Sequence, residues 1–150
     1  MATFKFRLAT LLRLREATRD ERRGQLAEAF RVDELLEAQL DRVGDESDWL
    51  RDRCRRVAGP GAVNVDQLVE TQRYELALRA QQMQLTQQRE QVAVEIERRR
   101  RALLAADRDV RVLEKLRDRQ AENHRQAEHR LETKQLDEAA GLLAAREEAR

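Results

Sequence analysis

Pro60 is the only proline in the 150 residues of this chain, and it lies between two glycines in Gly59-Pro60-Gly61. Proline has no backbone N–H and glycine accepts backbone angles that other residues avoid, so this triplet ends a helix and turns the chain. The stretches on either side contain no second break of this kind and are rich in charged residues. The turn is off-centre, and the stretch after it is the longer one. The sequence therefore predicts a hairpin of two long helices with unequal arms.

The composition is typical of an all-α protein. Charged residues make up 39% and hydrophobic residues 41% of the chain, but aromatic residues only 3%. This profile indicates long helices or a coiled coil, and so few aromatic residues cannot form the thick core of a globular enzyme. We therefore expect residues 1–150 to form a single elongated coiled-coil domain.

Charge, cysteine content and hydropathy limit the possible partners and the location. Lys plus Arg number 30 and Asp plus Glu number 29, interspersed along the chain, so a nucleic-acid partner gains little support. The single cysteine, Cys54, excludes an internal disulfide and is either a small apolar residue of the first helix or a redox-active thiol. No apolar run approaches the roughly 18 residues that span a bilayer, and Met1–Leu12 lacks the features of a signal peptide. We expect a cytoplasmic protein without a bilayer-spanning segment.

Apolar residues recur every seven positions in both long stretches. A seven-residue period over several repeats predicts the contact stripe of a left-handed coiled coil. In the first helix the expected stripe is Ala29, Leu36, Val43, Leu50 and Val57, flanked by Val32, Leu40 and Cys54. In the second helix it is Leu78, Leu85, Val92, Ile96, Leu103 and Val110, joined by Ala106 and Leu113.

The register of the hairpin follows if residues at equal distances from Gly61 face each other. Leu36 then opposes Leu85, and the first helix ends opposite residue 113. The C-terminal part of the second helix therefore overhangs, apart from cover by the first few residues of the chain. The apolar side chains in that opening segment either cap the end of the bundle or dock into a partner; they are Phe4, Phe6 and Leu8.

Local signals set the helix boundaries. We expect three segments: a first helix at about 9–58, a turn at 59–64 and a second helix at about 65–148. Gly59 is expected just beyond the first helix in a left-handed conformation. Asn64 followed by Gln67 has the spacing of an N-terminal capping box, and Asp66 is a competing cap.

The residues that enzyme chemistry requires are not apparent. The sequence has no glycine-rich phosphate loop, no paired cysteine motif and no arrangement of Ser, His and Asp on a concave scaffold. His124 and His129 are five residues apart and point away from each other on a helix, whereas metal-binding pairs are spaced by three or four. We therefore expect a non-enzymatic protein with no cofactor and no metal.

Arg98 to Arg101 form a run of four arginines in the second helix. Four consecutive helical residues spread around the whole circumference, so Arg99 is expected on or near the contact stripe. One interpretation is a solvated stretch paired with Glu95, Glu97 and acidic residues of the first helix. The other is an electrostatic contact with an acidic partner or with lipid headgroups.

Both ends of the chain resemble one known family. Val112–Gln120 (VLEKLRDRQ) and Glu132–Ala140 (ETKQLDEAA) closely resemble the C-terminal signature of the FliJ family, and Phe4–Leu8 with Leu11–Arg15 resemble its opening. Short coiled-coil segments imitate one another, but the ordered combination is much more specific. The resemblance covers essentially the whole chain. FliJ proteins are small components of the bacterial flagellar type III export apparatus.

The resemblance implies an antiparallel coiled coil similar to the central stalk of rotary ATPases. Its terminal end would insert into the hexameric ring of the flagellar export ATPase and activate it. The resemblance also implies contact with the membrane-embedded export gate, hence a peripheral position at the inner face of the cell membrane, and escort of export chaperones. The alternative is a general export chaperone or coiled-coil adaptor without ATPase stimulation. A third reading is a nucleic-acid or membrane-surface binder acting through Arg98 to Arg101.

The resemblance further implies contact residues. For the export gate, Tyr74 and Leu78 match the aromatic and aliphatic positions that the family places on the second helix after the loop, whereas Gln81 departs from the pattern. Ordinary packing on the first helix is the alternative for both. For the ATPase ring, the terminal signatures supply Arg13, Arg15, Leu113, Leu116, Arg117, Gln120, Leu136, Asp137 and Glu138. These residues either meet complementary charges on the ring or cap and solubilise the open end.

Overall fold

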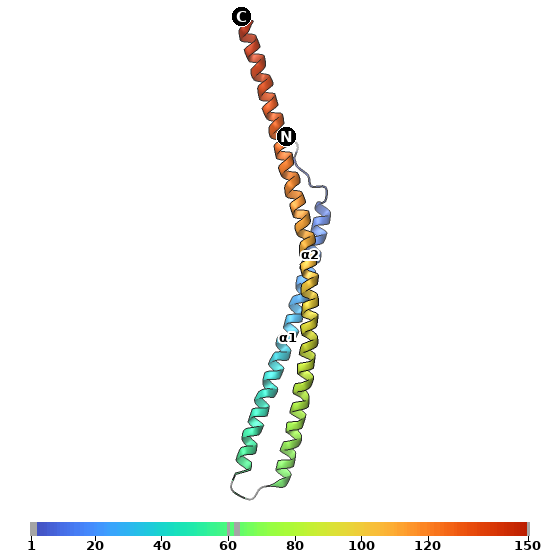
Figure 1. The fold of residues 1–150 in the computed structure, drawn as a ribbon, viewed down its shortest axis with the longest axis vertical. Coiled ribbons are helices and arrows are strands. Elements are labelled where there is room, and N and C mark those ends of the chain that lie inside the picture. Colours follow the sequence, from blue (N-terminus) through green and yellow to red (C-terminus); the bar gives the residue numbers. More distant parts are fainter. Residues whose placement is uncertain (1–2, 60, 62–63, 150) are drawn as a thin grey trace. The chain divides into compact units, whose positions relative to one another are not determined.

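The chain forms two long α-helices, α1 (Ala9–Val57) and α2 (Val65–Glu148), which pack against each other (Figure 1). The structure is a computed structural model and describes residues 3–59, 61 and 64–149. No strand occurs among those residues. The prediction of an all-α hairpin of two helices is confirmed. The helices contain 49 and 84 residues, so the arms are unequal.

Asn64 caps the start of α2. Its Oδ1 atom accepts hydrogen bonds from the backbone N–H groups of Asp66 at 3.1 Å and Gln67 at 3.3 Å. These N–H groups have no partner inside the helix, and an N-cap side chain supplies one. Asp66 therefore lies in the first turn of α2 and is not the cap.

Gly59 does not adopt the left-handed conformation expected of it. No described glycine has a positive φ angle. The helical hydrogen bonding of α1 continues one step past its end, because the N–H of Ala58 donates to the Cys54 carbonyl at 2.9 Å. A Cβ atom on Gly59 would lie 3.3 Å from the Arg56 carbonyl oxygen. Glycine therefore fits here because it has no Cβ atom, and not because the backbone is left-handed. Pro60 lies outside the described residues.

The chain divides into two compact units. We call Glu21–Leu104 the loop unit and the remainder, up to residue 20 and from residue 105, the terminal unit. In the loop unit, α1 and α2 run side by side in opposite directions and are joined by the loop (Figure 1). The expectation of a single domain over the whole chain stays a prediction.

The core of the loop unit is a narrow stripe of aliphatic side chains. Its buried members are Val43, Leu50, Leu78 and Leu85, with Leu36 and Leu40 packed against them. Ala29 and Ile96 are also buried. The heptad stripe is thus confirmed at these positions. Burial of such aliphatic side chains is the main favourable term for packing two helices together.

Two members of the expected stripe are exposed instead. Val57 lies on the last turn of α1 and mirrors Val65, the first residue of α2, so few side chains are available to cover it. Val32 lies at the edge of the stripe, where it lines a shallow surface groove with Leu36 and Val92. Both expectations were wrong, at Val57 because the stripe ends with the helix, and at Val32 because the residue lies at the edge of the stripe.

Cross-helix polar contacts fix the register of the loop unit. The Tyr74 hydroxyl donates to Glu46 at 3.1 Å, and the Arg89 guanidinium donates to Asp33 at 2.8 Å. The two residues of each pair lie at nearly equal distances from Gly61 in the sequence. Leu36 and Leu85, which the same rule pairs, belong to one cluster. The predicted register is therefore confirmed for this unit.

The terminal unit has a smaller core. Leu12 of α1 is buried, as are Ala106 and Val110 of α2. Arg15 forms an ion pair with Asp109 at 3.3 Å, and both side chains are about half exposed. Beyond this core, the opening segment of the chain reaches further along α2, because the Phe4 ring lies 5.8 Å from the His124 ring.

The last part of α2 in the terminal unit has no cover. Partly buried residues occur as far as Glu128, but every described side chain in 129–147 is exposed. The first residues of the chain therefore cover α2 somewhat beyond residue 113, and an uncovered helical segment remains. Among the described residues, neither helix has a stretch long and apolar enough to cross a membrane.

Candidate interaction sites

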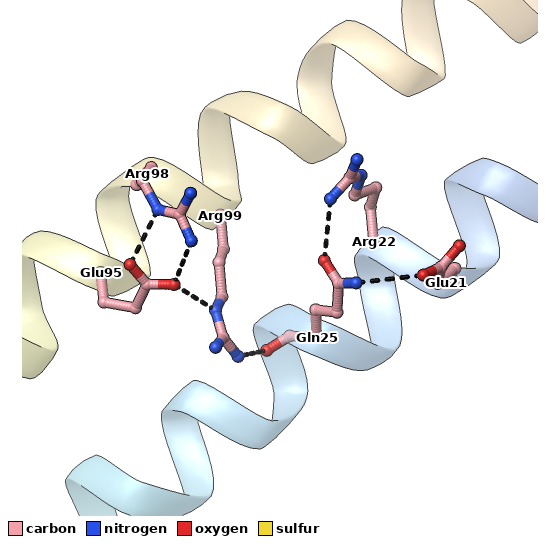
Figure 2. Close-up of polar contacts among 6 residues, drawn as sticks. All are labelled: Glu21, Arg22, Gln25, Glu95, Arg98 and Arg99. Carbon is pink, nitrogen blue, oxygen red and sulfur yellow. Dashed lines mark hydrogen bonds and ion pairs between the residues drawn. The ribbon is translucent and has the colours of Figure 1, made fainter.

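The arginine run of the loop unit is built around one carboxylate, that of Glu95 (Figure 2). Arg98 donates to both Glu95 oxygens at 2.8 and 2.7 Å, and Arg99 donates from Nε to Glu95 Oε1 at 2.7 Å. Hydrogen bonds from Arg98, then from Arg99, lower the pKa of Glu95 from its ordinary 4.5 to about 2. Hydrogen bonding to Glu95 likewise raises the pKa of Arg98. The predicted pairing of the run with Glu95 is confirmed.

Arg99 also joins the two helices. Its Nη1 atom donates to the backbone carbonyl of Gln25 on α1, and Figure 2 shows the side chain extended from α2 towards that carbonyl. The Gln25 side chain in turn donates to Glu21 at 3.2 Å and accepts from Arg22 at 3.1 Å. The expected place of Arg99 near the contact stripe is confirmed. This contact with α1 is made to a backbone carbonyl, whereas acidic side chains of that helix were expected.

The other two arginines of the run are exposed. Arg100 and Arg101 both pair with Glu97 at 3.4 Å, and the Arg100 guanidinium carbon lies 5.9 Å from the centre of the Phe30 ring. Exposed ion pairs at this distance contribute little to stability and are easily exchanged. Of the four arginines only Arg99 is partly buried, and contact of the exposed ones with a partner stays a prediction.

The two gate candidates differ in what they offer to a partner. Leu78 is only 3% exposed and belongs to the aliphatic core of the loop unit. Tyr74 is 45% exposed, and the hydrogen bond to Glu46, together with the charge of that carboxylate, raises the pKa of the Tyr74 hydroxyl. Tyr74 therefore presents a surface, while Leu78 supports the helix beneath it.

A groove beside Tyr74 was not anticipated from the sequence. It has a volume of about 340 Å³ and lies between the two helices of the loop unit near the loop. Its lining comprises Trp49, Leu50, Arg53, Val57, Gln67, Glu70, Thr71 and Tyr74. The Arg53 guanidinium carbon lies 5.3 Å from the centre of the Trp49 ring, a cation–π arrangement. The only sequence signal was a tryptophan followed four residues later by arginine, which are neighbours on a helix.

The ring candidates all belong to the terminal unit. Arg15 is joined to Asp109, and Arg117 pairs with the adjacent Asp118 at 3.0 Å. Leu113 is partly buried. The remaining candidates are exposed: Arg13, Leu116, Gln120, Leu136, Asp137 and Glu138. The side chains from the last signature lie on the uncovered segment, separate from those near Arg15.

The histidines do not form a metal site. His124 Nδ1 lies 3.5 Å from Glu128 Oε2, and the ring packs against Phe4. His129, the residue after Glu128 on α2, is exposed. Within the described part of the chain, no cluster of three or more His, Cys, Asp or Glu side chains is placed to hold a metal ion.

One protein family matches almost the whole chain. The family model described as "Flagellar FliJ protein" matches residues 4–149. No curated protein and no solved structure matches the chain. The family match includes both helices, the loop and the two terminal segments.

Proposed function

Because this chain belongs to the FliJ family and is a component of flagellar protein export, we propose that it is a stalk that activates the export ATPase. In this role the uncovered end of the terminal unit inserts into the hexameric ATPase ring. The protein itself hydrolyses nothing and needs no cofactor. It works in the cytoplasm, held at the inner face of the cell membrane by the rest of the apparatus.

The uncovered helical segment 129–147 is the observation that carries this proposal. It is exposed on all sides, yet it contains large aliphatic side chains, which are Leu131, Leu136, Leu142 and Leu143. Leucines exposed to water along a helix are unfavourable, and packing them against a partner lowers the free energy. A protein ring around the segment supplies such a partner.

Charged side chains near this end support the same role. Arg13 and Arg117 are exposed on α1 and α2 of the terminal unit, and Asp137 and Glu138 lie on the uncovered segment. Both signs of charge are present, so contact with a ring needs complementary charges in matching positions. Such contacts set orientation and association rate more than affinity, and salt weakens them.

The loop unit supplies the second set of contacts in this proposal. Tyr74, exposed near the loop, contacts the cytoplasmic region of the export gate, with Leu78 supporting the helix below. A stalk that contacts the ATPase through the terminal unit and the gate through the loop unit couples ATP hydrolysis to proton-driven export. Escort of export chaperones uses the same exposed helical surfaces.

An ATPase stimulation assay tests the proposed function. Purified protein at micromolar concentration is added to the cognate export ATPase, and phosphate release is followed with and without the chain. We expect faster hydrolysis with the ATPase and no hydrolysis by the chain alone. A folded, helical sample that gives no stimulation would count against the stalk. Capture of export chaperones by that same sample would then favour an adaptor role.

A further inference from the structure

The opening segment of the chain, which we call the strap (residues 3–8), lies against α2 of the terminal unit through an aromatic side chain. Phe4 and Phe6 of the strap are partly buried, whereas Lys5 between them is exposed. The Phe4 ring lies 5.8 Å from the His124 ring at an interplanar angle of 59°, which is a tilted aromatic contact. The strap therefore packs on α2 with apolar rings and leaves a charge in solvent.

Little besides these rings holds the strap in place. Its backbone is hydrogen-bonded to the start of α1, where the N–H of Ala9 donates to the Phe6 carbonyl at 3.2 Å. Within the described part of the chain, no hydrogen bond or ion pair joins the strap to α2. Segments with few buried contacts open locally at a lower cost in free energy than unfolding of the whole protein. The strap is thus able to leave α2 while both helices stay formed.

The face of α2 beneath the strap continues into the uncovered segment. Ala121, His124 and Glu128 are partly buried and lie about one helical turn apart. Leu131 lies about two turns after His124, and Leu142 lies about five turns after it, so both share its face. These two leucines are 59% and 69% exposed. The strap therefore covers the first part of a stripe on α2 whose continuation is bare.

We propose that the strap is a removable cover that competes with the ATPase ring for this stripe. In the free protein the strap packs on the stripe around His124. When the ring packs along the uncovered segment, its contact extends back along the same stripe, displaces Phe4 and releases the strap. The inference rests on the proposed function, in which the uncovered segment enters the ring. Such a competitor reduces the apparent affinity for the ring in proportion to the fraction of molecules whose strap is open.

The three phenylalanines of the chain report the position of the strap. Phe4 and Phe6 belong to it, while Phe30 lies in the loop unit and serves as an internal reference. Full-length protein labelled with 4-fluorophenylalanine is titrated with the purified export ATPase, and its ¹⁹F spectrum is recorded. We expect the two strap resonances to move to the shifts of a free peptide of residues 1–8 and to remain sharp. The Phe30 resonance should broaden with the slow tumbling of the complex.

Two substitutions loosen the strap from opposite sides of one contact. Phe4→Ala removes the ring on the strap, and His124→Ala removes the ring on α2. Each should lower the protein concentration that gives half-maximal ATPase stimulation by about three- to tenfold, because more molecules are open. The double variant should change it no further, since both substitutions remove the same interaction. Phe30→Ala is the matched control, because it removes the same kind of ring from the loop unit and should change nothing.

Circular dichroism establishes that every variant remains helical, and three results would then overturn the proposal. Strap resonances that broaden together with that of Phe30, at unchanged shifts, would show that the strap stays on α2 in the complex. A higher half-maximal concentration for Phe4→Ala would make the strap a part of the ring contact. In both cases normal stimulation by the wild type leaves the proposed function standing. If neither the wild type nor any variant acts on the ATPase, the proposed function fails and the competition fails with it.

Discussion

At the scale of single residues, the ionisation of Glu95 affects the stability of the loop unit. Its pKa in the folded chain is about 2, below its ordinary 4.5, because Arg98 and Arg99 donate hydrogen bonds to the carboxylate. A depressed folded pKa stabilises the fold fully above the ordinary pKa and ceases to do so as the pH falls through the folded value. The stabilisation by Glu95 should therefore disappear between about pH 4.5 and pH 2.

Glu95→Gln tests this pH dependence. The variant should melt at a lower temperature than the wild type at pH 7, and the difference should shrink as the pH is lowered towards 2. Glu97→Gln is the matched control, because Glu97 receives only the longer 3.4 Å contacts from Arg100 and Arg101. The effect is also expected to weaken in high salt, since the site is near the surface. A constant difference between Glu95→Gln and wild type at every pH would contradict the assignment.

The sequence predicted single-residue positions only where periodicity decides them. Arg99 had to lie near the contact stripe, because four consecutive helical residues point in all directions. The groove between Trp49 and Tyr74 did not follow from the pattern. It depends on how far apart the two helices lie near the loop and on which way Arg53 turns, and neither is encoded in an apolar repeat.

At the scale of the helices, the leucines of α2 divide into packed and uncovered ones. Leu78 is 3% exposed in the core of the loop unit, and Leu136 is 71% exposed on the uncovered segment. Leu78→Ala removes buried methyl groups and leaves a cavity, so it should lower the free energy of unfolding by about 2–4 kcal/mol. Leu136→Ala should change it by less than about 0.5 kcal/mol, as surface substitutions do.

Urea denaturation followed by circular dichroism at 222 nm measures both leucine variants. Since the two substitutions remove the same atoms from the same helix, a difference between them isolates burial from helix propensity. Equal and small effects would mean that Leu78 is not packed on α1. In that case Leu78 would be available for the gate contact that the family resemblance implies.

The helical elements themselves were predictable for clear physical reasons. A heptad stripe needs only the order of apolar residues, and the Asn64 cap needs only a side-chain acceptor before a helix. The prediction failed at Gly59, where helical hydrogen bonding continues through Ala58 without a left-handed residue. It also failed at Val57 and Val32, because the repeat says which face they share but not whether side chains of the other helix cover them.

At the scale of the whole molecule, the off-centre position of Pro60 predicted the unequal lengths of the two helices. The same position predicted the all-α hairpin. The reach of the opening segment was less predictable. The contact between Phe4 and His124 covers a part of α2 that lies beyond the N-terminal end of α1. Contacts between an irregular segment and a helix follow no sequence repeat, so the sequence does not predict them. The uncovered part of α2 begins at residue 129.

Deletion of residues 132–150 separates folding from function at this scale. No residue of the two cores is removed, so the melting temperature should change by no more than a few degrees, while total helix content falls with the lost segment. ATPase stimulation should be abolished, because the leucines and carboxylates of the uncovered segment are gone. Binding to the gate region through the loop unit, which the deletion leaves intact, should be retained, and this would show that the truncated chain is still folded and competent.

A full-length counterpart guards against an effect of shortening alone. The double variant Leu136→Asp and Leu143→Asp keeps the length of the chain but makes the uncovered segment uniformly polar, and it too should lose stimulation without losing stability. A large fall in melting temperature after the deletion would mean that the segment is packed in the free protein. Full stimulation by both variants would contradict a contact through the uncovered segment. It would assign the ATPase contact to the signature around Leu116 and Arg117, where α2 is partly covered.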